Sequence, residues 1–133
     1  MQTVKTIALH ALIIVVLAVA LLYADTLARQ RKEFARGEEA LARGDLMAAI
    51  AGYEAAVHMY TPGSSTVESA AARLWSMGEE LERKGDANGA LIAFRALRSS
   101  FCAVRWLAQP GREWLGRCDG KIAELTQKGK HVH

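Results

Sequence analysis

The sequence predicts an all-α protein with a single N-terminal transmembrane helix, on three observations. Residues 7–24 contain no fully charged side chain and are just numerous enough to cross a bilayer as a helix. The rest is rich in Ala, Leu, Arg and Glu, and the whole chain has only 2 prolines. A helix-pair pattern also occurs twice. We therefore expect a transmembrane anchor over residues 1–25, a helical domain over residues 26–127 and a flexible tail over residues 128–133.

The apolar run at residues 7–24 has two interpretations. Ala18, Val19 and Ala20 could form the small-residue cleavage site of a secretory signal peptide. The apolar stretch, however, continues past that site through Leu21, Leu22 and Tyr23. This continuation favours an anchor that stays in the bilayer.

The anchor is expected to continue into the domain as one helix. No Gly or Pro occurs between the apolar run and Gly37, so residues 3–43 should form a rod of about 60 Å at ~1.5 Å per residue. Leu27, Phe34 and Leu41 recur every seven residues and should form one apolar packing stripe. Such a rod would hold the domain at a fixed height above the bilayer.

Three polar residues share one face of the predicted anchor: Thr3, Thr6 and His10. They are typical of a polar seam that contacts a partner helix inside the membrane. The alternative is a neutral His10 close to the membrane interface, with no partner. Both interpretations remain open from the sequence.

The helix-pair pattern appears in two copies that lie 41 residues apart. A small residue precedes a Gly-Asp turn, and an Ala and an aromatic residue four apart follow it. A small or apolar residue ends the pattern. The first copy has Gly37, Gly44, Asp45, Ala49, Tyr53 and Ala56 at the six positions, and the second has Gly78, Gly85, Asp86, Ala90, Phe94 and Leu97.

On these residues the chain resembles the tetratricopeptide repeat family. The resemblance implies two helical hairpins, packed through Gly37, Ala49 and Tyr53 in one copy and through Gly78, Ala90 and Phe94 in the other. It also implies a module that binds or scaffolds proteins. The family period is about 34 residues, so the extra length is expected in the connection over residues 61–69.

The C-terminal part is expected to form a helix over residues 87–108, a break at residues 109–111, and a closing helix that ends near Gln127. Cys102 and Cys118 each lie eight residues from Pro110, so folding back at this proline places them opposite each other. They are either ordinary core residues or a disulfide, which would indicate an oxidising compartment.

Basic residues outnumber acidic ones from Arg95 onward, although the net charge is only +3. Arg98, Arg105, Arg112 and Arg117 are candidates for a basic interaction face. The alternative is a solvated helix surface. A net charge this small does not predict nucleic-acid binding.

No catalytic motif, phosphate-binding loop or metal-ligand cluster was found, so we expect neither enzyme activity nor a cofactor. The favoured function is a membrane-anchored scaffold or accessory subunit that binds other membrane proteins within a complex. The alternative is a peptide- or lipid-binding adaptor that uses the basic face.

The side of the membrane is contested. Lys and Arg residues after the run favour a cytoplasmic domain, whereas the short N-terminal tail resembles a signal anchor. We expect a bacterial inner-membrane protein with its domain in the periplasm.

Overall fold

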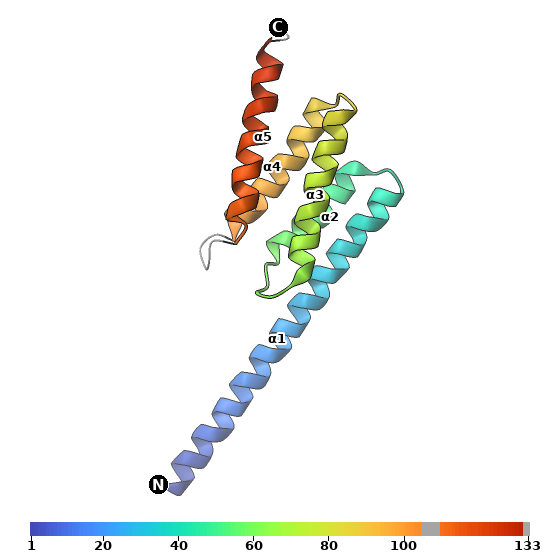
Figure 1. The fold of residues 1–133 in the computed structure, drawn as a ribbon. Helices are drawn as coiled ribbons and strands as arrows, with labels where there is room; N and C mark the ends of the chain where they lie inside the picture. Colours follow the sequence, from blue (N-terminus) through green and yellow to red (C-terminus); the bar gives the residue numbers. More distant parts are fainter. Residues whose placement is uncertain (105–109, 132–133) are drawn as a thin grey trace.

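The computed structural model describes residues 1–104 and 110–131, and every regular element in this part is a helix. The all-α prediction is therefore confirmed for the described residues. Figure 1 labels the helices, which are α1 (Gln2–Ala42), α2 (Leu46–His58), α3 (Ser65–Arg83), α4 (Ala87–Ala103) and α5 (Arg112–His131).

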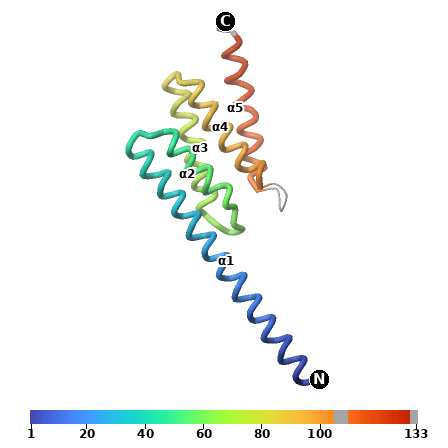
Figure 2. The backbone as a smooth tube through the Cα atoms, turned by 180° about the vertical axis from the view of Figure 1, so that it is seen from behind, coloured from blue at the N-terminus to red at the C-terminus, as the bar shows by residue number. Residues whose placement is uncertain are grey.

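Helices α2 to α5 gather beside the C-terminal half of α1, and the N-terminal half of α1 extends away from them (Figures 1 and 2). Helix α1 packs against α2, α3 against α4, and α5 against α4. Between the pairs, α2 packs against both α3 and α4. The two termini consequently lie at opposite ends of the molecule.

The same turn chemistry joins the helices within each pair. Gly44 and Gly85 adopt φ angles of 77° and 82°, a left-handed conformation that strongly favours glycine at a helix end. Asp45 and Asp86 then begin the next helix, where their side chains accept hydrogen bonds from the backbone N–H groups of Ala48 and Gly89.

Close helix contacts also recur at matching positions. A Cβ added at Gly37 would lie 2.8 Å from the ring of Tyr53, and one added at Gly78 would lie 2.5 Å from the ring of Phe94. Only glycine leaves room for these rings. The other four residues predicted to pack the repeats are fully buried in the surrounding core: Ala49, Tyr53, Ala90 and Phe94.

The buried face of α1 differs from the predicted seven-residue stripe. Its buried residues are Gln30, Gly37 and Ala40, whereas Leu27, Phe34 and Leu41 are only half-buried. The reason is the close approach of α2, since a Cβ added at Gly52 would lie 2.7 Å from the backbone nitrogen of Gly37. Small residues therefore occupy the centre of the contact, and Phe34 and Leu41 pack at its edges.

Two helix ends also differ from the prediction. Helix α4 ends at Ala103, earlier than the expected residue 108, and residues 105–109 lie outside the described part. Helix α5 continues past Gln127 to His131, into the segment expected to be a flexible tail. Lys128 supports this extra turn by an ion pair with Glu124, one helical turn earlier, at 2.6 Å.

Candidate functional site

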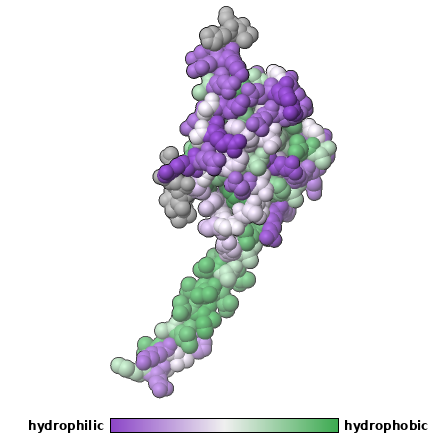
Figure 3. Space-filling model, in the orientation of Figure 1, coloured by the Kyte–Doolittle hydropathy of each residue, from purple (hydrophilic) through white to green (hydrophobic). Residues whose placement is uncertain are grey.

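The most distinctive surface is the uncovered N-terminal half of α1. This helix is long and apolar enough to cross a membrane, and none of its most apolar stretch is buried against the rest of the chain. Figure 3 shows this part as a nearly continuous hydrophobic band below a mostly hydrophilic domain. The exposure separates α1 from the core helix of a water-soluble protein, which would be covered.

The predicted polar seam lies on this uncovered helix. Thr6 donates its hydroxyl to the backbone carbonyl of Gln2 at 3.0 Å, and His10 Nδ1 lies 2.7 Å from the carbonyl oxygen of Thr6. A carbonyl only accepts hydrogen bonds, so Nδ1 carries a hydrogen, and in the neutral imidazole Nε2 is an acceptor. The side chains of Thr3, Thr6 and His10 are all exposed.

The seam and the domain occupy opposite sides of α1. His10 precedes Gln30, the first buried residue of α1, by 20 residues. At 3.6 residues per turn the two residues are about 160° apart around the helix axis. The domain therefore leaves the seam clear.

Gln30 joins α1 to the connection between α2 and α3. Its side-chain amide donates to the carbonyl oxygens of Ala56 at 3.1 Å and Met59 at 2.8 Å, near the C-terminal end of α2. Its Oε1 accepts a hydrogen bond from the hydroxyl of Ser64, the residue that caps α3. One fully buried side chain thus holds the end of one helix and the start of the next.

A second polar cluster links α1, α2 and α3. Tyr53 donates its hydroxyl to Glu38 at 2.6 Å, and Arg73 binds the same carboxylate at 2.8 Å. Burial, and then the hydrogen bond to Glu38, raise the pKa of Tyr53 well above its ordinary value. The Tyr53 hydroxyl therefore stays protonated at any physiological pH and serves the packing of α1 against α2 as a hydrogen-bond donor.

A groove opens beside this cluster, where the end of α1 faces α3. Its volume is about 290 Å³. The apolar part of its wall consists of Leu41, Leu46, Met77 and Leu81, and its charged residues are Arg73, Glu80 and Lys84.

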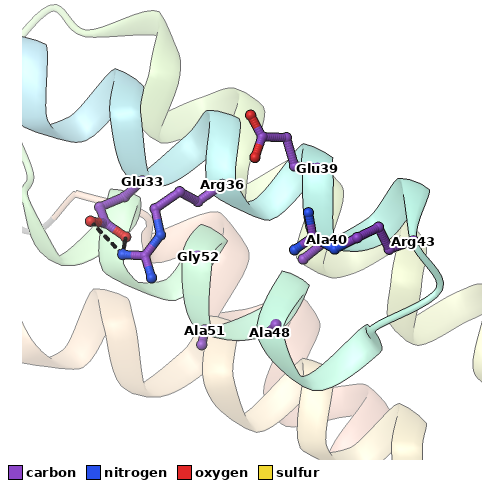
Figure 4. Close-up of a pocket in the computed structure, with 8 residues that line it drawn as sticks. All are labelled: Glu33, Arg36, Glu39, Ala40, Arg43, Ala48, Ala51 and Gly52. Atoms are coloured by element: carbon purple, nitrogen blue, oxygen red, sulfur yellow. Dashed lines mark hydrogen bonds and ion pairs between the residues drawn. The ribbon is translucent and has the colours of Figure 1, made fainter.

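A larger hollow of about 430 Å³ lies on the outer face of α1 and α2 (Figure 4). Ala48, Ala51 and Gly52 form its floor, while charged side chains of α1 stand around it. Glu33 and Arg36 bind each other at 3.0 Å. The residues that line the hollow include no cysteine or histidine.

The predicted basic face is only partly available. Arg98 binds Asp119 of α5 at 2.5 Å, a hydrogen bond that raises the pKa of the guanidinium. The guanidinium of Arg117 lies 4.2 Å from the ring centre of Trp75 and 4.6 Å from that of Trp114. Both arginines therefore serve contacts between helices. Arg112 begins α5 with an exposed side chain, and Arg105 lies outside the described residues.

Both cysteines are free thiols, so the structure does not contain the disulfide that the sequence allowed. Cys118 is fully buried and Cys102 is half-buried. Burial, reinforced by the nearby charge of Asp119, raises the pKa of Cys118 to about 11. The core-packing alternative describes Cys118 in this structure.

Two structural features were not predicted from the sequence: the burial of Gln30 and the contact of Arg117 with two tryptophans. Gln30 is three residues after Leu27 and four before Phe34, a spacing that places it on the buried face and could have identified it. The contact of Arg117 with two tryptophans joins α3 to α5 over 42 residues of sequence, counted from Trp75. No local pattern indicates such a contact.

Within residues 1–104 and 110–131, no group of three or more His, Cys, Asp or Glu side chains could hold a metal ion. Comparisons of the chain with profiles of known protein families, with curated proteins and with solved structures find no match.

Proposed function

We propose that this protein is a single-pass membrane scaffold or accessory subunit, which holds other membrane proteins within a complex. The observation that carries the proposal is the unbroken α1 helix. Its N-terminal half is apolar and uncovered, and its C-terminal half is the first helix of the domain. A partner bound to the domain would therefore be held rigidly relative to the bilayer.

A retained anchor is preferred over a cleaved leader. Residues 18–20, the candidate cleavage site, lie inside α1, and the same helix continues to Ala42. Val19 and Leu22 also line a depression against the domain, at the connection between α2 and α3. Removal of the leader would take away part of this contact.

We interpret the two helix pairs as tetratricopeptide-like repeats. Support comes from the matching glycine–aromatic contacts, Gly37 with Tyr53 and Gly78 with Phe94, and from the matching aspartate caps. The groove beside Leu41 and Met77 would bind an apolar segment of a partner. Modules of this kind bind and position proteins and carry no chemistry of their own.

Inside the bilayer, a partner helix would pack on the seam of Thr3, Thr6 and His10. The seam faces away from the domain, and His10 Nε2 offers an acceptor where lipid provides no hydrogen-bond donor. We place the protein in a bacterial inner membrane with its domain in the periplasm. The signal-anchor form of the N-terminus supports this side, against the Lys and Arg count, and the free cysteines add nothing to it.

The proposal is tested by purification of the full chain with its partners at low and high salt. Apolar contacts should retain the partners as salt rises through a few tenths molar. The adaptor alternative depends on charge. Its partners should dissociate under the same conditions, because salt shortens the Debye length, over which charges interact, to several Å.

A matched pair of anchor variants tests the seam. His10→Ala should reduce the recovery of partners, whereas Leu12→Ala should not, because Leu12 is exposed in the same membrane segment on the opposite side of α1. Equal recovery from both variants would contradict a seam at His10.

A further inference from the structure

The connection between α2 and α3 is fastened to α1 at the end of the apolar run. Tyr23, within residues 7–24, donates its hydroxyl to the backbone carbonyl of Pro62 at 2.9 Å. Gln30, two turns further on, holds the carbonyl oxygen of Met59 at 2.8 Å. These two bonds fix the position of the connection along the axis of α1.

A depression of about 310 Å³ separates this connection from α1. Its walls come from α1 on one side, through Val19, Leu22 and Tyr23 of the apolar run and Thr26 just after it, and from the connection on the other: Tyr60, Thr61 and Pro62. Val19 and Leu22 are 60% and 68% exposed. The domain thus reaches down beside side chains that belong to the apolar run.

The length of the run decides what surrounds these side chains. Its 18 residues span about 27 Å as a helix, slightly less than the roughly 30 Å of the hydrocarbon core. No part of the run can be left in water if it is to cross the bilayer. Val19 and Leu22 must then lie within the hydrocarbon or at its edge, and the connection beside them lies at the same level.

We propose that the connection between α2 and α3 inserts into the interfacial layer of the bilayer, so that the domain rests on the membrane surface. This inference rests on the proposed function, in which α1 crosses the bilayer. Tyr23 and Tyr60 are suited to this layer, because tyrosine rings pair an apolar body with a polar end and concentrate at headgroup level.

Several backbone carbonyls of the connection already accept hydrogen bonds within the protein, which lowers the cost of removing them from water. The carbonyl of Met59 accepts from Gln30 and from the Thr61 hydroxyl, that of Thr61 accepts from the Ser64 N–H, and that of Pro62 accepts from Tyr23. Polar groups that already have partners lose less on entering a medium poor in water. The connection also has no charged residue between Tyr60 and Ser65.

The test compares spin labels at two glycines in the full chain, reconstituted in phosphatidylcholine vesicles. Gly63 lies in the connection, and Gly85 lies in the turn between α3 and α4 at the far end of the domain (Figure 1). Their φ angles are 80° and 82°, and an added Cβ meets nothing within 4 Å at either residue. Gly63→Cys and Gly85→Cys are therefore closely matched, both made with Cys102→Ser.

Accessibility to dissolved oxygen, which concentrates in lipid, and to a water-soluble nickel chelate reports the depth of each label. The ratio of the two accessibilities should be several-fold higher at Gly63 than at Gly85. A third label, from Val15→Cys in the middle of the run, should give the highest ratio. Circular dichroism of each variant checks that the helices are retained.

The three labels test separately whether α1 crosses the bilayer and whether the connection inserts into its surface. A lipid-buried label at Val15 with equal, water-like ratios at Gly63 and Gly85 would overturn the seating of the connection and leave the anchor intact. A water-like ratio at Val15 would overturn the anchor and this inference together. Hydrogen exchange of the unsubstituted chain in lipid nanodiscs should agree, with slower exchange over residues 60–63 than in the turn at Gly85.

Discussion

Gln30 illustrates how a polar residue can be fully buried in a helical packing surface. It is fully buried, yet each of its polar groups has a partner on the end of α2 or the start of α3. Carbonyls near the C-terminal end of a helix lack intrahelical partners, and burying them unpaired is costly. A leucine in this position would fill the space, but the carbonyl of Ala56 would lose its bond from Gln30. That of Met59 would keep only its bond from Thr61.

Gln30→Ala should lower the free energy of unfolding by about 1–3 kcal/mol, because it strands buried hydrogen-bonding groups. The control Gln127→Ala removes the same side chain from an exposed position on α5 and should cost less than about 0.5 kcal/mol. Urea unfolding in detergent, followed by tryptophan fluorescence, measures both. Equal effects would show that the Gln30 contacts do not stabilise the domain.

Ala49→Leu and Ala90→Leu test the repeated close contacts. Both alanines are fully buried, so a larger side chain should overpack the core and cost about 1–3 kcal/mol. Ala87→Leu, at the exposed start of α4, should be nearly neutral. The same urea titration applies, and similar tolerance at all three positions would refute the alignment of the two copies.

The cysteines differ in reactivity. The thiolate is the reactive form, and a pKa of about 11 leaves buried Cys118 protonated at neutral pH. N-ethylmaleimide should add once, at half-buried Cys102, and twice after denaturation. Ionisation of Cys118 should destabilise the fold only as the pH rises from the unfolded-state pKa toward 11. Intact mass spectrometry counts the adducts; no adduct before reduction would instead indicate a disulfide.

At the scale of the element, several side-chain contacts join α5 to α3. Lys121 binds Glu82 at 2.7 Å, a hydrogen bond that raises the pKa of the lysine, and Trp114 donates to Glu68 at 3.0 Å. Arg117 lies over the rings of Trp75 and Trp114. These contacts connect α5 to α3, whereas its backbone lies against α4.

Arg117→Gln should therefore loosen α5, at a cost of about 0.5–1 kcal/mol typical of an exposed cation–π contact. The emission of the tryptophans should also change, because the cation leaves both rings. Arg95→Gln removes an exposed arginine from α4 and should change neither stability nor emission. Identical behaviour of the two variants would exclude a role for the Arg117 contact.

The elements that local chemistry determines could be predicted from the sequence. Gly44 ends one helix through its left-handed backbone conformation, and Asp45 begins the next through its side-chain cap. Gly85 and Asp86 repeat this pattern. The continuation of α5 to His131 is accompanied by the Lys128–Glu124 ion pair, an interaction between side chains that composition alone does not reveal. The start of α3 is capped by Ser64, through a bond to the N–H of Thr66.

The candidate site was less predictable, because its contacts join distant parts of the chain. The bond between Tyr23 and Pro62 spans 39 residues, and that between Gln30 and Ser64 spans 34. Neither has a periodic signal. How far the basic face is available could not be predicted for the same reason, since Arg98 binds Asp119 and Arg117 lies over two tryptophan rings.

At the scale of the whole molecule, α1 gives the protein its elongated shape (Figure 2). The helix has 41 residues, and its two halves meet different surroundings without a break. A continuous helix cannot bend freely between its two halves, so the position and rotation of the domain are linked to those of the uncovered N-terminal half. This rigid link is what the proposed scaffold role requires.

The most direct test of the account is the intact mass of the expressed chain, recovered from membranes washed with alkaline carbonate. Carbonate removes peripheral proteins and leaves those that cross the bilayer. A retained anchor predicts a membrane-bound product with the full mass of 14.5 kDa. A shorter product in the soluble fraction, cleaved near Ala20, would contradict the account, since the apolar run would then be a leader.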